Sequence, residues 1–386
     1  MQRTAATACR LEIGDEIHDP AWDAFLAQTP GGHHTQTSLW AQVKASVGWR
    51  ATRIVATRGG RIVAGAQLLL RPLPVIGAVG YVPRGPVAVM DDPEATRLVM
   101  EELLRLARVH RVQYLSIQPP SNDSVLAADL PRRGFQPSAR EVEPTATVVL
   151  DLSPSQDELL ARMKMRTRYN VRLGLRKGIV VREGTEADIP LFHRLLQATG
   201  GRQQFSAHPE EYFATVWRIL GSRGHVKLFL AEYNTEPLSA IFALAFGKCV
   251  YVWRAAWSGR HGNHRPNEVL HWAAITWAKA QGYQQYDFEG IDPRLARDLV
   301  EKEQGEHDAP AEQVQPPSQD RDQVPVSTNK ETVALFKLGF GGRIVLSPGA
   351  YDYLSNPVLR WTYTTVIPRI ARWPVVSRLE YLLRGI

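Results

Sequence analysis

The feature that most constrains the fold of this chain is an order of segments that occurs twice. Residues 53–71, RIVATRGGRIVAGAQLLLR, form the pattern of two β-strands joined by a Gly-Gly turn. Residues 226–253, VKLFLAEYNTEPLSAIFALAFGKCVYVW, alternate in the same way between apolar runs and polar turns. A helical pattern and one further strand follow each stretch, at 92–119 and 266–290. The repeat predicts two related α/β units, with coincidence between generic α/β segments as the alternative.

The helices of the repeat carry clear end signals. Asp92 and Pro93 suit the start of the first helix, in which apolar residues recur every three or four positions. Pro266 suits the start of the second helix and Gly282 suits its end. A further helical stretch precedes each group of strands, at 39–48 and 189–200.

The segment that joins the two units begins with a predicted strand over 145–152. One helix then follows, which Ser153 or Ser155 can cap and which Gly178 can end. Most of the charged residues of this helix are basic, and its acidic residues lie in the first turn, where the helix dipole favours them.

We divide the chain after this strand into an N-terminal domain, 1–152, and a C-terminal domain, 153–386. Residues 292–332, in the second domain, have almost no large apolar side chain after Val300. Such a segment cannot bury enough surface to offset the entropy lost on ordering, so we expect a mobile loop or lid. A plain surface insertion is the alternative. The sequence LFKLGFGGRIV, 335–345, then predicts a strand.

The charge balance favours a polyanionic partner. The formal net charge is +7 and the sequence pI is near 9.4, although charge that serves solubility alone is the alternative. In the tail, 356–386, arginines are interleaved with tryptophan and tyrosine. That mixture suits a peripheral membrane contact, whereas a helical tail packed on the second domain is the more common arrangement.

Several motif classes are absent, and the chain has the composition of a soluble globular protein, with 44% hydrophobic and 22% charged residues. Cys9 and Cys249 lack metal-ligand spacing, and the histidines at 33–34 and 261–264 lack that of a zinc site, so we expect no disulfide framework and no metal. The N-terminus lacks the apolar core of a signal peptide, and no long apolar window occurs, which predicts a cytoplasmic protein. No nucleophile elbow, Walker loop or dinucleotide fingerprint is present.

Coenzyme A is poorly supported by the sequence. Ordinary acetyltransferases hold its pyrophosphate with backbone amides at a helix N-terminus. In the second unit that place carries Pro266, Asn267 and Glu268, which do not suit close approach of a phosphate. In the first unit the corresponding place is occupied by the acidic stretch 84–95.

Seven short motifs follow one another in an order that resembles the Fem (FemABX) aminoacyltransferase family. They lie between about Gln36 and Tyr351 and read QTSLWAQVK, YVPRGPV, RTRYNVRLGLRKGI, HPEEYF, AAWSGR, YDFEGI and FKLGFGG. The resemblance implies two tandem acetyltransferase-like (GNAT) units, each a mixed, mainly antiparallel sheet flanked by helices. It implies transfer of an amino acid from aminoacyl-tRNA to an amine of a peptidoglycan precursor, lipid-linked or UDP-linked, during interpeptide bridge formation. No cofactor is implied beyond aminoacyl-tRNA as co-substrate.

The resemblance also implies roles for individual residues. Phe336 and Lys337 match the family's terminal Phe-Lys pair, which is linked to catalysis, and Lys44 matches a lysine that contacts phosphates of the precursor. Other motif positions are assigned to substrate binding: Arg84, Arg202, His208, Tyr212, Arg254 and Ser258. Four arginines of the basic helix are assigned to tRNA phosphates, with a solvated charged face as the alternative: Arg166, Arg168, Arg172 and Arg176.

Two positions depart from the family pattern. His208 stands where the family often has arginine, and Arg202 lies nearby as a substitute. At the strand end that contains Tyr286 and Asp287, Glu289 replaces the first of two glycines. An extra carboxylate is therefore expected at the site.

The implied reaction is aminolysis of an ester, during which negative charge develops on the carbonyl oxygen. We expect the compact cation of Lys337 to stabilise that oxygen or to hold the tRNA terminus. An exposed lysine on an edge strand is the alternative. Asp287 or Glu289 would accept the proton of the amine, or would cap a neighbouring turn.

Two other functions stay open at this point. One is a tRNA- or coenzyme A-dependent acyltransferase that makes a small peptide or amide metabolite. The other is a non-catalytic module that binds nucleic acid or a membrane surface. The transferred amino acid, the acceptor amine and the oligomeric state do not follow from the sequence. We expect the protein in the cytoplasm, peripheral at the inner face of the membrane.

Overall fold

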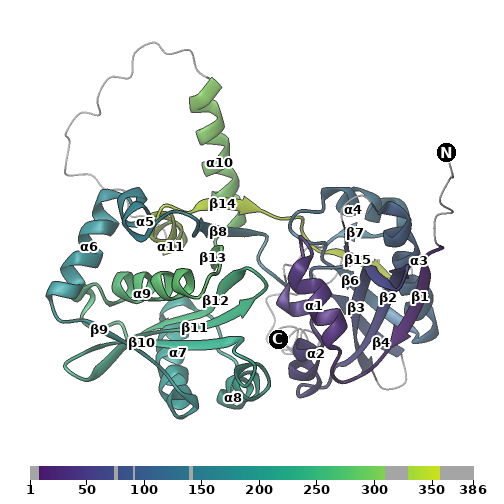
Figure 1. Ribbon diagram of the computed structural model, residues 1–386, viewed down its shortest axis with the longest axis horizontal. Helices are drawn as coiled ribbons and strands as arrows, with labels where there is room; N and C mark the ends of the chain where they lie inside the picture. Colours follow the sequence, from purple (N-terminus) through teal and green to yellow (C-terminus); the bar gives the residue numbers. More distant parts are fainter. Residues whose placement is uncertain (1–7, 74–76, 90–91, 139–141, 309–328, 357–386) are drawn as a thin grey trace. The chain divides into compact units, whose positions relative to one another are not determined.

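The chain forms two compact α/β units in a computed structural model that describes residues 8–73, 77–89, 92–138, 142–308 and 329–356 (Figure 1). Unit 1 consists of the described parts of Met1–Glu143, Glu211–Arg223 and Ser347–Ile386. Unit 2 consists of the described parts of Pro144–Glu210 and Gly224–Leu346. Each unit is built around one mixed sheet.

The sheet of unit 1 has the strand order β1-β2-β3-β4-β6-β15-β7, with β5 paired to β3. Its neighbours are antiparallel except for β4 and β6, which run parallel. The strands are β1 (Arg10–Gly14), β2 (Arg50–Arg58), β3 (Arg61–Leu73), β4 (Gly77–Val82), β5 (Val87–Ala88), β6 (Val112–Ile117), β7 (Gln136–Pro137) and β15 (Tyr351–Leu354).

Helix α3 (Pro93–Val109) covers one face of this sheet with its apolar stripe, which includes Val99, Leu103 and Leu106. As predicted, Asp92 caps the helix by accepting a hydrogen bond from the Ala95 amide at 3.0 Å. The remaining helices of the unit are α1 (Pro20–Gln28), α2 (Ser38–Ala45), α4 (Ser124–Asp129) and, apart from its first residue, α8 (Glu210–Val216).

The sheet of unit 2 has the order β14-β8-β13-β12-β11-β10-β9, and its neighbours are antiparallel except for β12 and β13. The strands are β8 (Ala146–Asp151), β9 (Val180–Glu183), β10 (Val226–Tyr233), β11 (Glu236–Phe246), β12 (Cys249–Trp257), β13 (Gln285–Gly290) and β14 (Arg343–Leu346). The helices are α5 (Gln156–Arg162), α6 (Met165–Arg176), α7 (Ile189–Gln203), α9 (Pro266–Ala280), α10 (Pro293–Asp308) and α11 (Asn329–Leu338).

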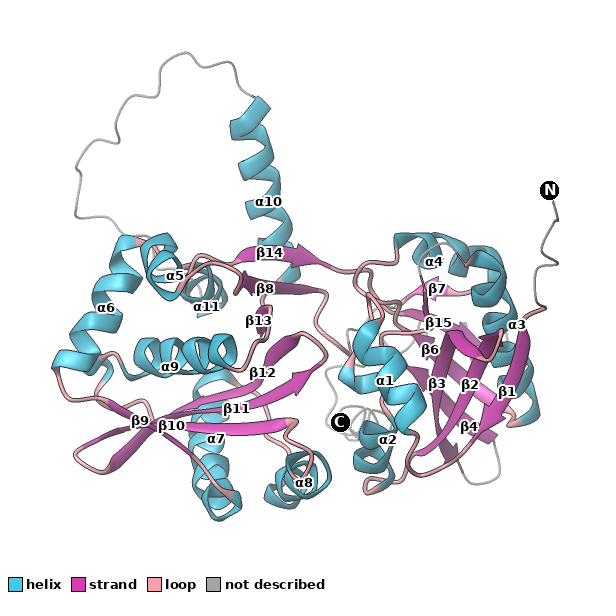
Figure 2. Ribbon diagram, in the orientation of Figure 1, coloured by secondary structure: helices cyan, strands magenta, loops and turns pink. Residues whose placement is uncertain are grey.

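Helices α9 and α7 lie on opposite faces of the second sheet (Figure 2). Ile241 of β11 and Val250 of β12 belong to the core that includes α9. The ring of Phe242, the next residue along β11, lies 5.3 Å from Phe192 of α7. Because successive strand residues point to opposite faces, the nearly continuous apolar run of β11 follows from burial on both sides.

The predicted repeat is confirmed as two equivalent orders of elements. In unit 1 they are β2-β3-β4, α3 and β6, and in unit 2 they are β10-β11-β12, α9 and β13. In both units the strand before the helix pairs in parallel with the strand after it.

The division of the chain differs from the boundary suggested by the sequence. The strand over 146–151 lies inside the sheet of unit 2, between β14 and β13. Residues 351–354 return to unit 1, where β15 pairs with both β6 and β7. A boundary at residue 152 therefore separates strands that are hydrogen bonded to each other.

Three local expectations need correction. The single helix expected after Ser155 is two helices, α5 and α6, because Met163 takes extended dihedrals at the end of α5. Residues 293–308 of the expected loop are helical, and 309–328 lie outside the described residues. The expected strand over 335–345 is wrong in its first half, because α11 runs to Leu338 before a glycine turn leads into β14. The tail from 357 also lies outside the described residues.

Candidate functional site

The two parallel strands of unit 2, β12 and β13, separate near the middle of β13. They are paired at Cys249–Gln285, Val250–Tyr286 and Tyr251–Asp287. After Asp287 the register of β13 shifts, and Gly290 pairs with Thr147 of β8. The carboxyl end of β13 therefore turns away from β12, which is the type of place where open α/β sheets bind ligands.

The corresponding parallel strands of unit 1, β4 and β6, do not separate in this way. The Gln118 amide donates to Val82 O at 3.0 Å and the Gly85 amide donates to Gln118 O at 2.9 Å, which continues the pairing beyond β4. The buried amide of Gln36 fills the adjacent space, since it donates to Pro83 O at 2.5 Å. A Cβ on Gly85 would lie only 2.9 Å from this side chain. We therefore place the candidate reactive centre in unit 2.

Glu289 causes the turn of β13 by adopting a left-handed backbone conformation with φ of 62°. Glycine occupies such a conformation most easily, because a Cβ crowds the following carbonyl oxygen. The Asp287 carboxylate supports the turn by accepting a hydrogen bond from the Glu289 amide at 2.7 Å. The glycine that the resemblance implies at this position would have a conformational reason, and this chain adopts the conformation with a glutamate.

Lys337 reaches the same strand end from the last turn of α11. Its Nζ donates to Glu289 O at 3.0 Å and to Gly290 O at 2.6 Å. The side chain is only partly exposed and lies on a helix, so the alternative of an exposed lysine on an edge strand is wrong. An ammonium group has three donors, and within the described residues these two carbonyls are its hydrogen-bond partners.

Burial lowers the pKa of Lys337 from 10.5 to about 8, although the carboxylates of Glu289 and Asp287 oppose this change. The group is therefore mostly an ammonium at neutral pH and loses its charge in mildly alkaline solution. A cation that is partly desolvated and poised near neutrality is typical of functional sites.

An aromatic cluster holds the backbone that carries Lys337. Phe336 and Phe340 lie at 5.4 and 5.6 Å, between ring centroids, from His271 of α9. The Nδ1 atom of His271 lies 3.0 Å from the Tyr286 hydroxyl, inside the same core. Burial, with a smaller effect from Lys337, lowers the pKa of His271 to about 3, so this imidazole is neutral. Phe336 contacts this core, whereas the Lys337 ammonium lies at the strand end.

Sequence reasoning missed His271 and also Tyr251. Tyr251 of β12 pairs with Asp287 of the neighbouring strand β13. Its side chain points away from the α9 core, which contains its neighbours Val250 and Val252. Burial, together with Cys249 and Asp287, raises the pKa of Tyr251 well above 10. No local motif marks either residue, because both reach the site only through the pairing of distant segments.

Three of the predicted substrate-binding residues lie in unit 1. The Lys44 ammonium is buried between the rings of Trp40 and Tyr212, at 5.8 and 5.9 Å from their centroids. Arg84 is also buried and has a left-handed φ of 45°. Burial, with His34 and Arg84, lowers the pKa of His33 well below 6.5, which keeps that neighbour neutral. Two desolvated cations in one unit suit recognition of phosphate or carboxylate.

The other predicted substrate-binding residues lie in unit 2, mostly around the end of β12. Arg202 stacks on Trp257 and donates to its carbonyl oxygen. Ser258 accepts a hydrogen bond from the Arg260 amide at 3.1 Å. Arg254 stacks on Trp253 instead, with its guanidinium carbon 4.9 Å from the ring centroid. His208 uses its carbonyl oxygen to accept a hydrogen bond from His193 at 3.0 Å.

The predicted basic helix is α6, and it covers the turn that precedes α9. Gly174 of α6 packs so closely that a Cβ there would lie 2.8 Å from His264 O. The amides of His264 and Arg265 are used within the turn, where they donate to His261 O and Gly262 O. Pro266 opens α9 and supplies no amide hydrogen. This helix N-terminus therefore offers little to a pyrophosphate.

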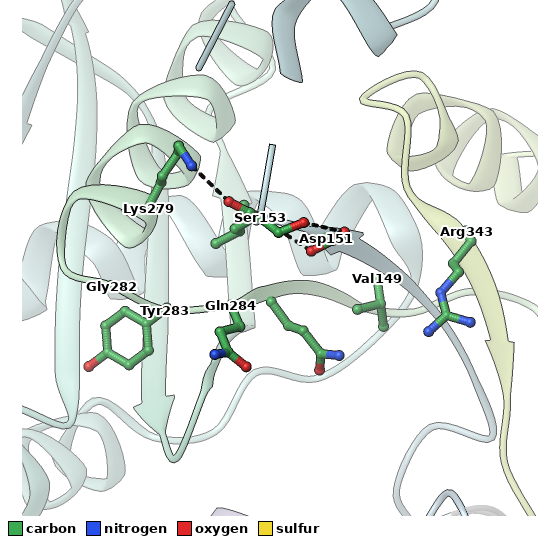
Figure 3. A pocket seen from close by; sticks show the side chains of 10 residues that line it. Val149, Asp151, Ser153, Lys279, Gly282, Tyr283, Gln284 and Arg343 are labelled. Carbon is green, nitrogen blue, oxygen red and sulfur yellow. Dashed lines mark hydrogen bonds between the residues drawn. The ribbon is translucent and has the colours of Figure 1, made fainter. Parts of the chain in front are cut away.

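Figure 3 shows a separate pocket of about 800 Å³ in unit 2, at the start of β13. Lys279, Asp151 and Arg343 line it, and Lys279 donates to Leu152 O at 2.9 Å. The strand from Gln285 to Gly290 spans about 16 Å, so this pocket does not contain the Lys337 ammonium. Within the described residues, no group of three or more His, Cys, Asp or Glu could hold a metal ion. No helix in the described ranges combines the length and apolar character that a membrane span needs.

Comparison with known proteins follows the division into units. The sequence profile described as the FemAB family matches residues 17–129, and the profile described as an acetyltransferase (GNAT) domain matches residues 161–296. The crystal structure of FemX aligns over 92% of this chain and 99% of its own, with a TM-score of 0.73 and 21% identity. The chain thus resembles the Fem family in the sequence of residues 17–129 and has the fold of FemX. Its fold is accordingly that of two tandem GNAT units, as the sequence predicted.

Two further proteins match a smaller share of the chain or match its fold less closely. The lipid II:glycine glycyltransferase of Staphylococcus aureus (strain MRSA252) is 28% identical over 238 residues, which is 59% of this chain and 56% of the relative. The chain thus matches little more than half the length of these Fem relatives. A tandem GNAT protein from the clavulanic acid biosynthesis pathway aligns over 90% of this chain, with a TM-score of 0.51 and 14% identity. Similarity at that level describes the fold alone.

Proposed function

We propose that this protein is an aminoacyltransferase that moves an amino acid from aminoacyl-tRNA to an amine of a peptidoglycan precursor. The Staphylococcus aureus relative named lipid II:glycine glycyltransferase supports this class of reaction and of acceptor. The observation that carries the proposal is the Lys337 ammonium, which is held by two carbonyls at the open end of β13. With respect to the described residues, one donor of this cation remains for an incoming oxygen.

The geometry supports a reaction without a covalent intermediate on the protein. An amine attacks the ester carbonyl of the donor, and the oxygen of the tetrahedral intermediate gains negative charge. The fixed Lys337 ammonium would stabilise that charge, because its first two donors already hold it in place. Asp287 or Glu289 would take the proton lost by the amine, since both carboxylates lie close enough to influence the Lys337 pKa. The C–O bond of the ester then breaks, the carboxylic acid returns the proton to the leaving tRNA oxygen, and an amide and a tRNA hydroxyl result.

The buried cations of unit 1, Lys44 and Arg84, would bind anionic groups of the precursor, and Tyr212 would assist them. Arg202, His208, Arg254 and Ser258 stay assigned to substrate in unit 2. The assignment of Arg166, Arg168, Arg172 and Arg176 to tRNA stays a prediction from the sequence. Their helix carries other exposed side chains, which bear on the choice of partner below.

A coenzyme A-dependent acyltransferase is the second candidate, because a GNAT profile matches residues 161–296. The covered turn before α9 argues against it, since the His264 and Arg265 amides are already used. Coenzyme A is therefore expected to leave the melting temperature unchanged. A clear stabilisation by coenzyme A would favour the second candidate, because a ligand that binds the native state raises its stability.

The direct test is amino acid transfer from total charged tRNA to lipid-linked and nucleotide-linked precursors. Lys337→Met should lower the rate about 100–1000-fold, because one interaction with the developing oxyanion is lost. Lys279→Met is the matched control, since Lys279 donates to a backbone carbonyl at the far end of β13. Lys279→Met should transfer at the wild-type rate. Equal rates for Lys337→Met and wild type would refute the role of the cation.

The pH profile gives a second readout of the same group. With a pKa of about 8, Lys337 loses its proton as the pH rises, so the wild-type rate should fall above about pH 8. Lys337→Arg should be slower but should keep its rate across this range, because a guanidinium stays charged. Parallel declines in both proteins would assign the alkaline limb to another group.

A further inference from the structure

The solvent-exposed side of helix α6 combines cationic side chains with apolar and aromatic ones. Six residues of this helix are exposed, and we call them the α6 face: Met165, Arg166, Tyr169, Arg172, Leu175 and Arg176. Three are apolar or aromatic and three are cationic. Met165 is 79% exposed, Tyr169 55% and Leu175 52%. No acidic residue occurs between Lys164 and Lys177.

The opposite side of α6 is fixed against α9, so the α6 face cannot turn inward. Asn170 donates to the Glu268 carboxylate at 2.9 Å, and buried Val171 belongs to the core of unit 2. A Cβ on Gly174 would lie 2.5 Å from Val269 Cγ2. The exposed apolar groups therefore have no place in the core of their own unit.

The arginines of the α6 face form no ion pairs with the part of the chain that the structure describes. Within the described residues, no ion pair or hydrogen bond involves the side chains of Arg166, Arg172 and Arg176. On the exposed side of α3, by contrast, Arg97 pairs with Glu101 and Arg105 pairs with Glu102, both at 2.7 Å. Among the described residues, the charge of the α6 face thus has no acidic partner.

We infer that the α6 face binds the surface of an anionic lipid membrane. Phosphates of RNA would account for the three arginines but would leave exposed methionine and leucine side chains in water. An anionic bilayer accounts for both, because arginine meets the headgroups while apolar and aromatic side chains enter the interface.

The α6 face also connects to the candidate reactive centre. The Lys164 amide, at the start of α6, donates to Gly339 O at 2.9 Å, two residues after Lys337. This hydrogen bond therefore links the start of helix α6 to the turn that follows Lys337. A consequence that rests on the proposed function is that membrane docking would bring this centre to a lipid-linked precursor. The membrane binding itself is testable without any precursor.

The test uses the full-length protein and sedimentation with vesicles. Wild type should bind vesicles of equimolar phosphatidylglycerol and phosphatidylcholine, and should bind pure phosphatidylcholine much less. Arg172→Glu/Arg176→Glu should lower the partition coefficient by about tenfold or more, since each arginine near an anionic surface contributes to binding. Met165→Ser/Tyr169→Ser keeps every charge and should lower it by about fivefold or more.

Matched controls lie on unit 1. Arg97→Glu/Arg105→Glu makes the same change in net charge, and Val109→Ser/Val125→Ser removes two other exposed apolar groups. Both controls should bind as wild type does. Lys337→Met should also keep vesicle binding while it loses transfer, so failure of the proposed function and failure of this inference are distinguishable.

Binding of total tRNA to the same variants decides between the two partners. If Met165→Ser/Tyr169→Ser binds vesicles as wild type does, the inference is wrong. It is also wrong if the arginine variant loses affinity for tRNA but not for vesicles, because the α6 face is then an RNA site. Loss of vesicle binding in both α6 variants, with both controls intact, supports a membrane surface.

Discussion

Glu289 shows at the scale of one residue how a departure from a family pattern can be read. Its φ of 62° is the conformation in which glycine is favoured, so the turn at the end of β13 has been kept although the glycine has not. The strain of a left-handed glutamate is offset by two local hydrogen bonds: the Glu289 amide donates to the Asp287 carboxylate, and the Lys337 ammonium donates to the Glu289 carbonyl. A strained residue beside a buried cation points to a use for its side chain.

Glu289→Gly should raise the free energy of unfolding by about 1 kcal/mol, because glycine relieves the left-handed strain. Glu289→Ala, which keeps the strain but loses the carboxylate, is the control and should gain nothing. Chemical denaturation measures both. If Glu289→Gly is no more stable than Glu289→Ala, the strain is not where the structure places it.

At the scale of elements, the contact between α6 and α9 has two consequences. It covers the turn before α9, which argues against pyrophosphate binding, and it leaves the α6 face in solvent. Gly174 makes this contact possible, since it brings the two helices together at a point where a Cβ would meet Val269. Ser155, one of the two caps that the sequence suggested, starts α5 in a capping box with Glu158, and α6 follows after a short break.

Gly174→Ala should lower the free energy of unfolding by about 1–3 kcal/mol, because the added methyl overlaps Val269 and the His264 carbonyl. Gly201→Ala is the matched control, since it also lies in a helix but has no atom within 4 Å of the added Cβ. That variant should gain about 0.5–1 kcal/mol from helix propensity. Similar values for both substitutions would contradict the close packing of α6 on α9.

At the scale of the whole molecule, the chain does not run through one unit and then the other. Residues Glu211–Arg223 and strand β15 belong to unit 1, although they follow large parts of unit 2 in the sequence. Strand β15 lies between β6 and β7, so the sheet of unit 1 is incomplete until the end of the described chain has been added. Folding of unit 1 therefore depends on contacts of long sequence separation.

A fragment of residues 1–152 should lack a cooperative thermal transition by circular dichroism. It has no β15 to join β6 and β7, and its last strand, β8, has lost both partners of the second sheet. The same fragment with residues 347–356 on a flexible linker should regain part of the transition. A fragment 1–152 that melts as sharply as the full chain would show that unit 1 is complete without its later segments.

The sequence by itself determined the repeated order of strands and helices, the cap of α3, two candidate caps for α5, and the resemblance to the Fem family. These features depend on apolar periodicity, on turn residues and on short motifs, which are local properties. The sequence did not predict that residues 335–338 belong to helix α11. Leu335, Phe336 and Leu338 also fit the apolar pattern of a strand, and packing against His271 decides between helix and strand.

Tertiary structure alone decided which distant residues meet. Lys337, Glu289 and His271 come from three separate segments, and their contacts follow from how β13, α9 and α11 pack. The left-handed turn at Glu289 and the return of β15 to the first sheet were likewise invisible to local patterns. The physical reason is that burial, desolvation of a charge and strand pairing are properties of neighbours in space, and a sequence records only neighbours along the chain.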